Sequence, residues 1–545
     1  MYKETFVDST GKAHKLEIRF HRESRMRYRV NSIDDLITDN YKLLIEYIEH
    51  HKKRQKPRIQ ELYDYAEGNN HSISQEQRRS DADMADNRIV HNFGKSISVF
   101  KQGYLVGKPI VVEYDDNEEY SSIDETLKEI GRVNNFHNLN RSLVKDLSQV
   151  GRAYDLVYRS SDDITKVKRL DPLETFVIYD MSLENNSIVA VRYYSSGIFD
   201  NAREFVEFYS SDRIVRFENK EGSLIELETH PHVFSTIPIT EYLNNEQGLG
   251  DYETELSLID SYDAVESDTA NYMTDTSDAI LAIIGDIEFP PDVANDSAKQ
   301  IEYMRRMRRA RLLQIKPPTD LQGNDKNVDA KYLYKQYDVS GVEAYKSRIV
   351  NDIHKFTNTP DMTDQNFSGV QSGEAMKYKL FGLEQERVDT QAIFEKSLRR
   401  RYKLIASVGQ YVQELVDFDI SKLKITFNPN LPKVMKEVID SFTALGGMIS
   451  NETAMAITGI VENPKGEIAK LEENNKQEPA YDIEEPQEAL SKNMYKITSI
   501  LAKYKKGDIS RGVAIKLFNQ IGIDEIGASE YLDEGLMDEA GFGKL

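Results

Sequence analysis

The chain has 545 residues, with 92 Asp and Glu against 70 Lys and Arg, and a formal net charge of −22 at pH 7. This length exceeds one compact unit, so we expect about two to four domains. The absence of cysteine excludes disulfides, thiolate metal sites and a cysteine nucleophile, and suits a reducing cytoplasm. No apolar run approaches the roughly 18 residues of a membrane span, and residues 1–30 contain no secretory segment, so we expect a soluble protein.

The N-terminal segment, residues 1–31, is rich in Lys and Arg. Turn residues at Ser9–Gly11 and alternating apolar residues at Leu16, Ile18 and Phe20 favour a hairpin or strand. Basic arms often contact nucleic acid, although a surface strand is the commoner outcome. We interpret this segment as a short basic arm or hairpin.

Residues 32–250 have the pattern of one α+β domain. Ser32 with Asp34 and Asp35 begins a helical region to about Glu67, broken near Pro57, in which the basic run His50–Arg58 reads as a solvated helix end. Further helices are predicted at Asn87–Gly103 and Ile123–Val150. Strands are predicted at Ile110–Tyr114, Ala153–Arg159, Thr175–Tyr179, Ile188–Tyr194, Glu204–Tyr209, Arg213–Glu218 and Leu224–Glu228.

Three motifs in this domain fail as ligand sites. Gly103–Lys108 has three residues between its glycines and is followed by Pro109, whereas a P-loop needs four and then Ser or Thr before a helix. Asp115–Glu119 lacks the glycine and terminal glutamate of an EF-hand loop. His230 and His232 bracket a proline and imply no third metal ligand. The sequence thus predicts no nucleotide, calcium or zinc site here.

An acidic window follows, because Glu221–Ala298 contains eighteen Asp and Glu and no Lys or Arg. Within it, Asp251–Ile284 has the apolar spacing of a helix. One interpretation is a solvated face that keeps the protein soluble. The other is a wall facing a polyanion that slides past, since Lys and Arg contacts to phosphate are what make nucleic acid bind tightly.

A small insert then carries a basic cluster. Pro290 and Pro291 end the preceding helix, and a new helix begins near Asp296 and leads to a strand at Leu312–Lys316. Its cluster consists of Arg305, Arg306, Arg308, Arg309 and Arg311. We favour pairing of these arginines with acids of a neighbouring subunit; contact with phosphate or with a docking partner is the alternative.

Beyond the insert, a helix at Val342–Phe356 ends before Pro360, and a polar loop spans Thr359–Ser372. A long helix is predicted at Gly373–Phe418, followed by a strand at Lys424–Phe427. The remaining predicted elements are helices at Lys433–Leu445, Asn451–Ile460, Ala489–Tyr504 and Ser510–Ile521, a charged linker at 462–486 and an acidic tail at 523–545.

Four segments, in order, resemble the phage portal protein family typified by the portal of Bacillus phage SPP1. They are NRIVHNFGKSISVFKQGYLVGKPI (Asn87–Ile110), LIDSYDAVESDTANYMTDTSDAILAI (Leu258–Ile283), FSGVQSGEAMKYKLFGLE (Phe367–Glu384) and ITFNPNLPKVMKEVIDSFTALGGMISNETAMA (Ile425–Ala456). The resemblance implies a multi-domain α+β, mainly α, portal fold that assembles as a dodecameric ring with a central channel.

By resemblance the chain divides into an arm (1–31), wing (32–250), first stem helix (251–285), clip (286–340), second stem helix (341–358), tunnel loop (359–372), long wing helix and strand (373–430), crown (431–475) and a C-terminal linker, helices and tail (476–545). The tunnel loop would face DNA through Asp361, Asp364, Gln365, Asn366, Phe367, Ser368, Val370 and Gln371. The stem acids expected to line the channel are Asp260, Asp263, Asp268, Asp275 and Asp278.

The expected function is a passive conduit for double-stranded DNA at one capsid vertex, with no catalysis, cofactor, metal or membrane contact. Expected partners are further copies of the chain, the terminase large subunit, the major capsid protein, a scaffolding protein and a head-completion adaptor. The expected location is the virion, with assembly in the host cytoplasm.

Two alternatives stay open. A hydrolase or nuclease would use paired carboxylates such as Asp260 with Asp263 or Asp361 with Asp364, although no base, nucleophile or phosphate cradle accompanies them. Another ring-forming virion adaptor would share the assembly but not the four segments. A ring with a central hole favours the portal, whereas a monomer or dimer with metal-dependent cleavage favours the enzyme.

Overall fold

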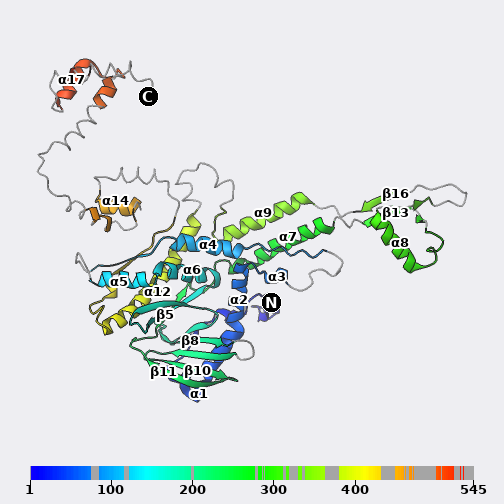
Figure 1. Cartoon of the computed structure of the whole chain (residues 1–545), viewed down its shortest axis with the longest axis horizontal. Helices are drawn as coiled ribbons and strands as arrows, with labels where there is room; N and C mark the ends of the chain where they lie inside the picture. The colour runs from blue at the N-terminus through cyan, green and yellow to red at the C-terminus, as the bar shows by residue number, and fades with distance from the viewer. Residues whose placement is uncertain are drawn as a thin grey trace. The chain divides into compact units, whose positions relative to one another are not determined.

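A computed structural model describes residues 2–74, 85–115, 122–197, 202–275, 280–284, 286–287, 289–310, 315–317, 329–333, 338–361, 380–430, 449–458, 461, 466–468, 470–471, 499–504, 506–507, 509–520, 528–529 and 532. The chain divides into two compact units, residues 1–449 with 457–462 and residues 450–456 with 463–545. Helices and strands are mixed throughout the first unit, in agreement with the predicted α+β class (Figure 1).

The N-terminal arm is a hairpin, as predicted. Strands β1 (Tyr2–Val7) and β2 (Ala13–Ile18) pair antiparallel. Asp8 closes the turn, since its Oδ1 accepts hydrogen bonds from the backbone N–H of Thr10 at 2.9 Å and of Lys12 at 3.0 Å. A short 3-10 helix (Arg22–Arg25) and β3 (Tyr28–Arg29) lead from the hairpin into the main body.

The next helical region continues through Pro57, where the sequence predicted a break, and is kinked instead at Thr38–Tyr41, where Asp39, Asn40 and Tyr41 have a positive φ. Helix α1 (Ile33–His50) begins after Ser32, as predicted, with a capping box between Ser32 and Asp35. A π-helical turn (His51–Gln55) joins it to α2 (Lys56–Glu67). Pro57 lies in the first turn of α2, where no N–H is needed, so it does not interrupt the helix. The interpretation of His50–Arg58 as a solvated helix end was wrong for His51, Gln55 and Arg58, because all three are buried. Helix α3 (His71–Ser74) follows.

A six-stranded sheet of order β11-β10-β9-β8-β7-β3 packs against α1. All neighbours are antiparallel except β3 and β7, and Val215 of β10 faces Phe208 of β9 in the buried register. Its five longer strands match predicted segments: β7 (Thr175–Tyr179), β8 (Ser187–Ser196), β9 (Arg203–Tyr209), β10 (Arg213–Lys220) and β11 (Ser223–Pro231).

A three-stranded sheet of order β12-β5-β6 lies beside it. Strand β5 (Arg152–Arg159) was predicted, whereas β6 (Thr165–Leu170) and β12 (Ile239–Leu243) were not. The sequence of β6, TKVKRL, contains three bases and only two apolar residues, Val167 and Leu170, so its low apolar content gave no strand prediction. Pairing with β5 supplies the strand conformation.

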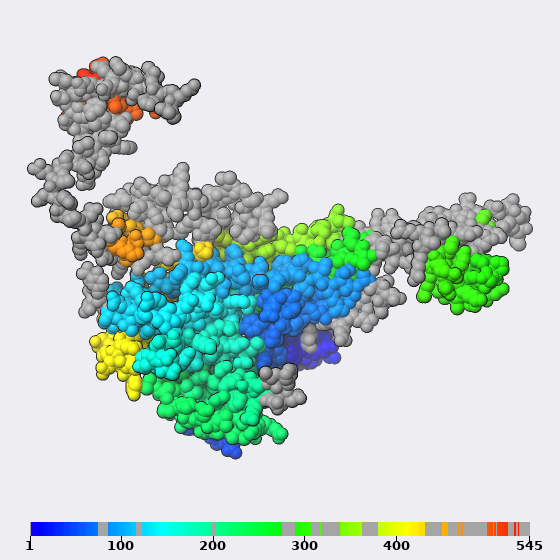
Figure 2. Space-filling model, in the orientation of Figure 1, coloured from blue at the N-terminus to red at the C-terminus, as the bar shows by residue number. Residues whose placement is uncertain are grey.

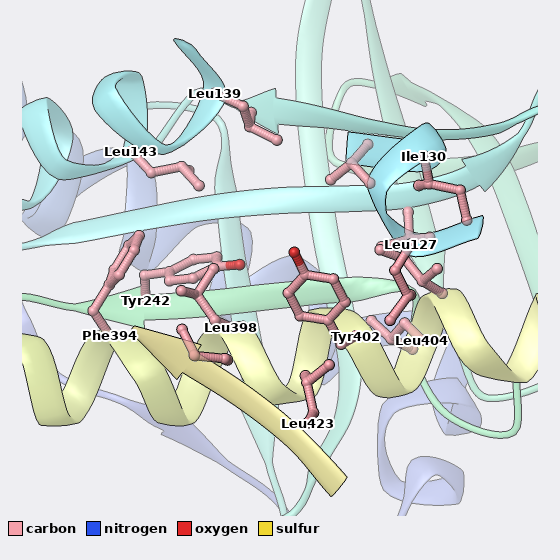
Figure 3. Close-up of a cluster of buried hydrophobic side chains, with 14 of the residues drawn as sticks. Leu127, Ile130, Leu139, Leu143, Tyr242, Phe394, Leu398, Tyr402, Leu404 and Leu423 are labelled. Carbon is pink, nitrogen blue, oxygen red and sulfur yellow. The ribbon is translucent and has the colours of Figure 1, made fainter. Parts of the chain in front are cut away.

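The largest core lies between this sheet and a layer of helices (Figure 3). Side chains from α5 (Ser122–Val133), α6 (Phe136–Val150), α12 (Phe381–Tyr411), β12 and β17 (Leu423–Thr426) meet there. Helix α4 (Phe93–Val106) packs beside α6, and on the face drawn in Figure 2 helices α4, α5 and α6 form one continuous surface. Strand β4 (Val111–Tyr114) pairs with β17 and so joins segments about 300 residues apart.

Helix α12 is shorter than the predicted Gly373–Phe418. It ends at Tyr411, and Gln413 has a left-handed φ of 62°. Leu415 folds back onto the helix, where a Cβ added at Gly409 would lie 2.7 Å from its Cδ1. Because Gly409 has no side chain, it leaves room for Leu415 to be buried against the end of the helix. A short 3-10 helix (Ile420–Lys422) precedes β17, and residues 373–379 lie outside the described residues.

Helices α7 (Leu256–Asp275) and α9 (Val339–Phe356) lie side by side in Figure 1, preceded by a 3-10 turn (Glu253–Glu255). The prediction that one helix runs from Asp251 to Ile284 was wrong at its end. Residues Ile280–Ile284 form β13, paired antiparallel with β16 (Asp329–Leu333), because this run is rich in β-branched isoleucine and has a partner strand. The insert also contains β14 (Asp286–Ile287) paired with β15 (Ile315–Lys316), and α8 (Ser297–Ala310).

The second unit contains most of α14 (Asn451–Thr458), α17 (Arg511–Gln520) and a helical stretch at residues 499–504. Ser450 caps α14, since its Oγ accepts the N–H of Thr453 at 3.3 Å. The predicted helix at Lys433–Leu445 lies outside the described residues. Among the parts of the chain that the structure describes, no helix is long and apolar enough to cross a membrane.

Candidate functional site

Helices α7 and α9 share a small apolar core with α2 and α4. Leu256 and Ile259 of α7 and Ile349 and Ile353 of α9 are all buried in this core. Lys346 of α9 lies 2.7 Å from Glu266 of α7 and 2.8 Å from Glu343, and its hydrogen bonds to these two acids raise its pKa. One lysine therefore joins the two helices and offsets part of the acidic charge on α7.

Two of the five acids predicted to line a channel are used inside the subunit. Asp260 accepts a hydrogen bond of 2.6 Å from Arg19 and another from the hydroxyl of Tyr65. Asp263 is fully buried and accepts 2.7 Å and 2.9 Å hydrogen bonds from Asn70 Nδ2 and from the backbone N–H of His91. Burial raises the pKa of Asp263. The prediction that Asp263 lines a channel was therefore wrong, and Asp260 is largely covered by its arginine partner.

The other three stem acids differ in what the structure describes. Asp268 is exposed on α7. Asp275 is the last residue of α7, and its side chain lies outside the described atoms, as does the whole of Asp278. Asp268 and Asp275 are seven residues apart and therefore recur on one helix face. Their position along a channel stays a prediction.

The extended segment Asn87–His91 lies along α7, although the sequence predicted it as helix. The backbone N–H groups of Asn87, Ile89 and His91 donate to the side chains of Asn271, Ser267 and Asp263 at 2.5, 2.9 and 2.9 Å. Every second residue of the segment thus meets every fourth residue of the helix, in antiparallel direction. The α4 helix begins only at Phe93, because Asn92 caps it by accepting the N–H of Lys95 at 3.0 Å.

The start of the predicted tunnel loop is tied to α9 and α12. His354 Nδ1 lies 3.0 Å from the carbonyl of Thr359, and the N–H of Thr359 donates to the carbonyl of His354 at 3.0 Å. Asn358 donates to Glu386 of α12 at 3.2 Å, and a Cβ added at Gly382 would lie 2.8 Å from Asn358 Oδ1. The two ends of the segment between α9 and α12 are therefore held together.

Of the loop residues predicted to face DNA, the structure describes only Asp361, which is half-buried. The others lie outside the described residues: Asp364, Gln365, Asn366, Phe367, Ser368, Val370 and Gln371.

The basic cluster of the insert lies on α8, which Asp296 caps by accepting the N–H of Ala298 at 3.0 Å. Arg305 and Arg306 are exposed, and Arg306 lies 4.0 Å from Glu302. The side chains of Arg308, Arg309 and Arg311 lie outside the described atoms. The predicted pairing of these arginines with a neighbouring subunit stays a prediction.

The basic N-terminal arm contacts its own subunit. Arg19 reaches Glu61 and Asp260, and Arg25 lies 3.0 Å from Glu253. Glu253, at the entry to α7, also accepts a 2.7 Å hydrogen bond from the buried Arg58. The sequence analysis missed this buried Arg58–Glu253 pair, because the two residues are far apart along the chain and each looks like an ordinary surface charge.

The carboxylates do not form a catalytic pair. Asp260 and Asp263 share a face of α7, but one is held by Arg19 and Tyr65 and the other by Asn70 and His91. Within the described ranges, no group of three His, Asp or Glu side chains has the geometry to hold a metal ion. His230 contacts Glu228 at 3.0 Å and His232 contacts the carbonyl of Ser210 at 3.0 Å, so the two rings bind different partners.

Comparison with known proteins supplies the class. The family model for "Phage portal protein, SPP1 Gp6-like" matches residues 45–480. The chain is 23% identical over 423 residues to the portal protein of Bacillus phage SPP1, covering 74% of this chain and 78% of that protein. It is also 23% identical over 384 residues to the portal protein of Clostridium phage phiCD119 (strain Clostridium difficile/United States/Govind/2006). That match covers 67% of this chain and 80% of that protein.

Two solved structures are similar at a lower level. A chain from the neck of an empty GTA particle has a TM-score of 0.37 and 12% identity, covering 68% of this chain and 90% of that chain. A chain from the virion of a native gene transfer agent particle has a TM-score of 0.35 and 11% identity, covering 74% of this chain and 93% of that chain.

These sequence matches define a structural component of a phage virion rather than an enzyme. The chain belongs to the SPP1 Gp6-like phage portal protein family. All four segments on which the resemblance rested lie within the matched residues, which confirms it.

Proposed function

We propose that this chain assembles as a dodecameric ring at one capsid vertex, and that double-stranded DNA passes through the ring during packaging and ejection. Membership of the portal family over residues 45–480 is the observation that carries the proposal. In this assignment residues 32–250 form the wing, α7 and α9 the stem, 286–340 the clip, 359–372 the tunnel loop and 431–475 the crown.

The stem supports the proposal through its exposed apolar side chains. Tyr345 and Phe356 of α9 are 51% and 57% exposed, and Met273 of α7 is 59% exposed. Tyr345 and Phe356 are eleven residues apart, which places them on one face after about three helical turns. A slender helix pair with such a face is stabilised when copies pack side by side in a ring.

The proposed channel wall uses two acids of α7. Asp268 and Asp275 share a face of α7 and are not among the carboxylates held by Arg19, Asn70 or His91. Carboxylates facing the bore repel phosphate and leave DNA no cationic contact, so the polymer slides without binding tightly. In this assignment the polar tunnel loop narrows the bore. Its hydrogen-bonding groups carry no positive charge, so they do not bind DNA tightly either.

The partners follow from the same assignment. The clip, with the exposed Arg305 and Arg306, docks the terminase large subunit and afterwards a head-completion adaptor. The wing contacts the major capsid protein and, during assembly, a scaffolding protein.

A packaging reaction tests the proposal. Asp268→Lys with Asp275→Lys should leave rings intact by electron microscopy yet reduce the amount of DNA packaged, because each subunit then offers two cations to phosphate. Glu17→Lys with Glu129→Lys, at side chains that are 53% and 54% exposed in the hairpin and on α5, matches the charge change away from the stem. Equal packaging by both double variants would contradict the assignment of these acids to the bore.

A further inference from the structure

The turn between β7 and β8, residues 180–186, presents two apolar side chains to solvent. Met181 is 61% exposed and Leu183 is 99% exposed, and only one residue separates them. Single exposed apolar side chains are common on protein surfaces, whereas a pair at the tip of one turn forms a small contact surface. We call residues 180–186 the β7–β8 knob.

Asp180 holds the knob in one conformation. Its Oδ1 accepts hydrogen bonds from the N–H and Oγ of Ser182 at 3.2 and 2.7 Å and from the N–H of Asn186 at 2.9 Å. The N–H of Asp180 in turn donates to the carbonyl of Asn186 at 2.9 Å. The hydrogen bonds from Ser182 and Asn186 lower the pKa of Asp180, so the carboxylate stays ionised. A turn fixed in this way loses little conformational entropy when a partner covers its tip.

The same chain contains a cleft of matching character, with a volume of about 380 Å³, between α5, α6, β4 and α12. Its buried lining includes Leu127, Leu398 and Tyr402, which belong to the largest core (Figure 3). Val112 and Phe136 are partly buried and also line it. The volume lies in the usual range for protein ligand pockets. A cleft that opens onto core side chains offers an apolar environment to a methionine and a leucine from another molecule.

The charges of the knob and the cleft are opposite. The knob contains Asp180 and Glu184 and has no Lys or Arg. The cleft is lined by Lys128, Arg132 and His137, with no Asp or Glu among the described residues that line it. The apolar tip of the knob therefore lies between acids, and the apolar cleft has bases in its lining.

The two bases of the cleft are weakly held by their own helix. Lys128 lies 2.5 Å from Asp124 and Arg132 lies 2.5 Å from Glu129. The side chains of Lys128 and Arg132 are 58% and 79% exposed, and ion pairs at such surface positions contribute little to stability. Both bases are thus available to the acids of an incoming knob.

We propose that the β7–β8 knob of one subunit inserts Met181 and Leu183 into this cleft of the neighbouring subunit. The inference rests on the proposed function, because that function requires the chain to form a ring. The knob and the cleft are different surfaces of one chain, so their contact is heterologous, and a repeated heterologous contact closes into a ring. Each subunit then uses its knob on one neighbour and its cleft on the other.

Cross-linking of the assembled full-length protein tests this contact directly. The chain has no cysteine, so the thiols of a Leu183→Cys, Lys128→Cys variant are the only targets of a short bis-maleimide. We expect a ladder of products longer than two subunits on denaturing gels, because every subunit is joined to two neighbours. The two single-cysteine variants, when co-expressed, should give dimers at most. The control pair is Leu183→Cys, Val99→Cys, with Val99 52% exposed on α4, and should give only background.

Dilution of the rings, followed by mass photometry, tests the energetic contribution. Leu183→Asp changes a side chain that is 99% exposed in the subunit, so the subunit should fold as before. It should raise the concentration at which half of the protein is in rings by at least about tenfold, since a leucine no longer becomes buried. Val99→Asp is the matched control and should shift this concentration less than about twofold.

A second variant fills the cleft from the other side of the contact. Gly131 lines the cleft, and a Cβ added there would lie 3.4 Å from Phe136, which is an ordinary contact, so α5 should accept Gly131→Met. This variant should weaken the rings as Leu183→Asp does. A gain in Tm together with weakened rings would show that the loss comes from the occupied cleft and not from unfolding.

Background cross-linking of the Leu183→Cys, Lys128→Cys variant in intact rings would overturn the inference, and so would dimers as its longest product. Equal dilution behaviour of Leu183→Asp and Val99→Asp would overturn it as well. Normal rings of Leu183→Asp that fail to enter capsids would assign the knob to the coat instead. Absence of rings in the unsubstituted protein would overturn the proposed function together with this contact, so the two failures are distinguishable.

Discussion

The backbone N–H of His91 donates a 2.9 Å hydrogen bond to Oδ1 of Asp263, and the ring Nδ1 of the same histidine lies 3.0 Å from that oxygen. This contact joins the segment before α4 to the middle of α7. Asn70 fixes the second carboxylate oxygen at 2.7 Å. A buried aspartate with three donors thus holds α7 against Asn70 and the segment before α4.

Asp263→Ala should destabilise the protein by about 2 to 4 kcal/mol, because Asn70 and the backbone N–H of His91 lose their acceptor in a buried position. Asp268→Ala is the matched control, since Asp268 lies on the same helix and is exposed. Its effect should stay within about 0.5 kcal/mol. Chemical denaturation measures both values, and similar losses would contradict the structural role of Asp263.

The buried Arg58–Glu253 pair should be costly to break. Both side chains are 2% exposed, and Arg25 adds a second cation 3.0 Å from Glu253. Glu253→Ala leaves a buried guanidinium without its carboxylate and should cost about 3 to 5 kcal/mol. Glu17→Ala, which breaks an exposed pair with Lys3, should cost less than about 1 kcal/mol. Thermal unfolding measures both variants. Equal Tm values would contradict this account of the buried Arg58–Glu253 pair.

Two glycines with the same φ of 81° separate backbone strain from crowding. A Cβ at Gly151 would lie 2.2 Å from the carbonyl oxygen of Gly248, whereas a Cβ at Gly222 would meet nothing within 4 Å. Gly222→Ala should therefore cost only the left-handed strain, about 1 to 2 kcal/mol. Gly151→Ala should lower the free energy of unfolding clearly more, because the backbone at Gly248 must move to make room for the methyl group. The difference in free energy of unfolding between Gly151→Ala and Gly222→Ala measures the crowding at Gly151. Equal losses in the two variants would show that Gly151 and Gly248 do not approach so closely.

His51 predicts a loss of stability in acid. Its ring is buried, with Nδ1 2.8 Å from the hydroxyl of Tyr193, and burial together with Arg152 and Lys56 lowers its pKa from 6.5 to about 3. Between these values the unfolded chain binds a proton that the folded chain does not, so stability is complete above pH 6.5 and declines as the pH falls towards 3.

The contribution of His51 to that decline approaches about 1.4 kcal/mol per pH unit. His51→Gln removes the titrating group while keeping polar atoms beside Tyr193, so its stability should depend less steeply on pH between 6.5 and about 5. Denaturation curves at a series of pH values test this, and His14→Gln at a half-exposed position of the hairpin is the control. An unchanged slope in His51→Gln would contradict the burial of a neutral histidine.

Local patterns in the sequence predicted most of the elements. The helix starts at Ser32 and near Asp296 and the five longer strands of the large sheet were predicted correctly. These signals are local, since a cap binds an N–H two or three residues away and alternation reports one exposed and one buried face of a strand. Such features need no knowledge of distant parts of the chain.

The errors concern partners far away in the sequence. Asn87–His91 is extended because Asn271, Ser267 and Asp263 accept its N–H groups, and nothing within the segment itself indicates a helix as its partner. Ile280–Ile284 is a strand because Asp329–Leu333 pairs with it. Asp263 was read as a channel acid for the same reason: a carboxylate on an acidic helix looks solvated until its donors, Asn70 and His91, are known.

Single-particle electron microscopy of the purified full-length protein tests the central claim most directly. The account predicts class averages of a ring with a central hole and twelve repeats, and a particle mass twelve times the subunit mass of 62.6 kDa. The stem acids Asp268 and Asp275 should face that hole, with Asp263 inside each subunit. A particle of one or two subunits, both in solution and when extracted from virions, would contradict the account.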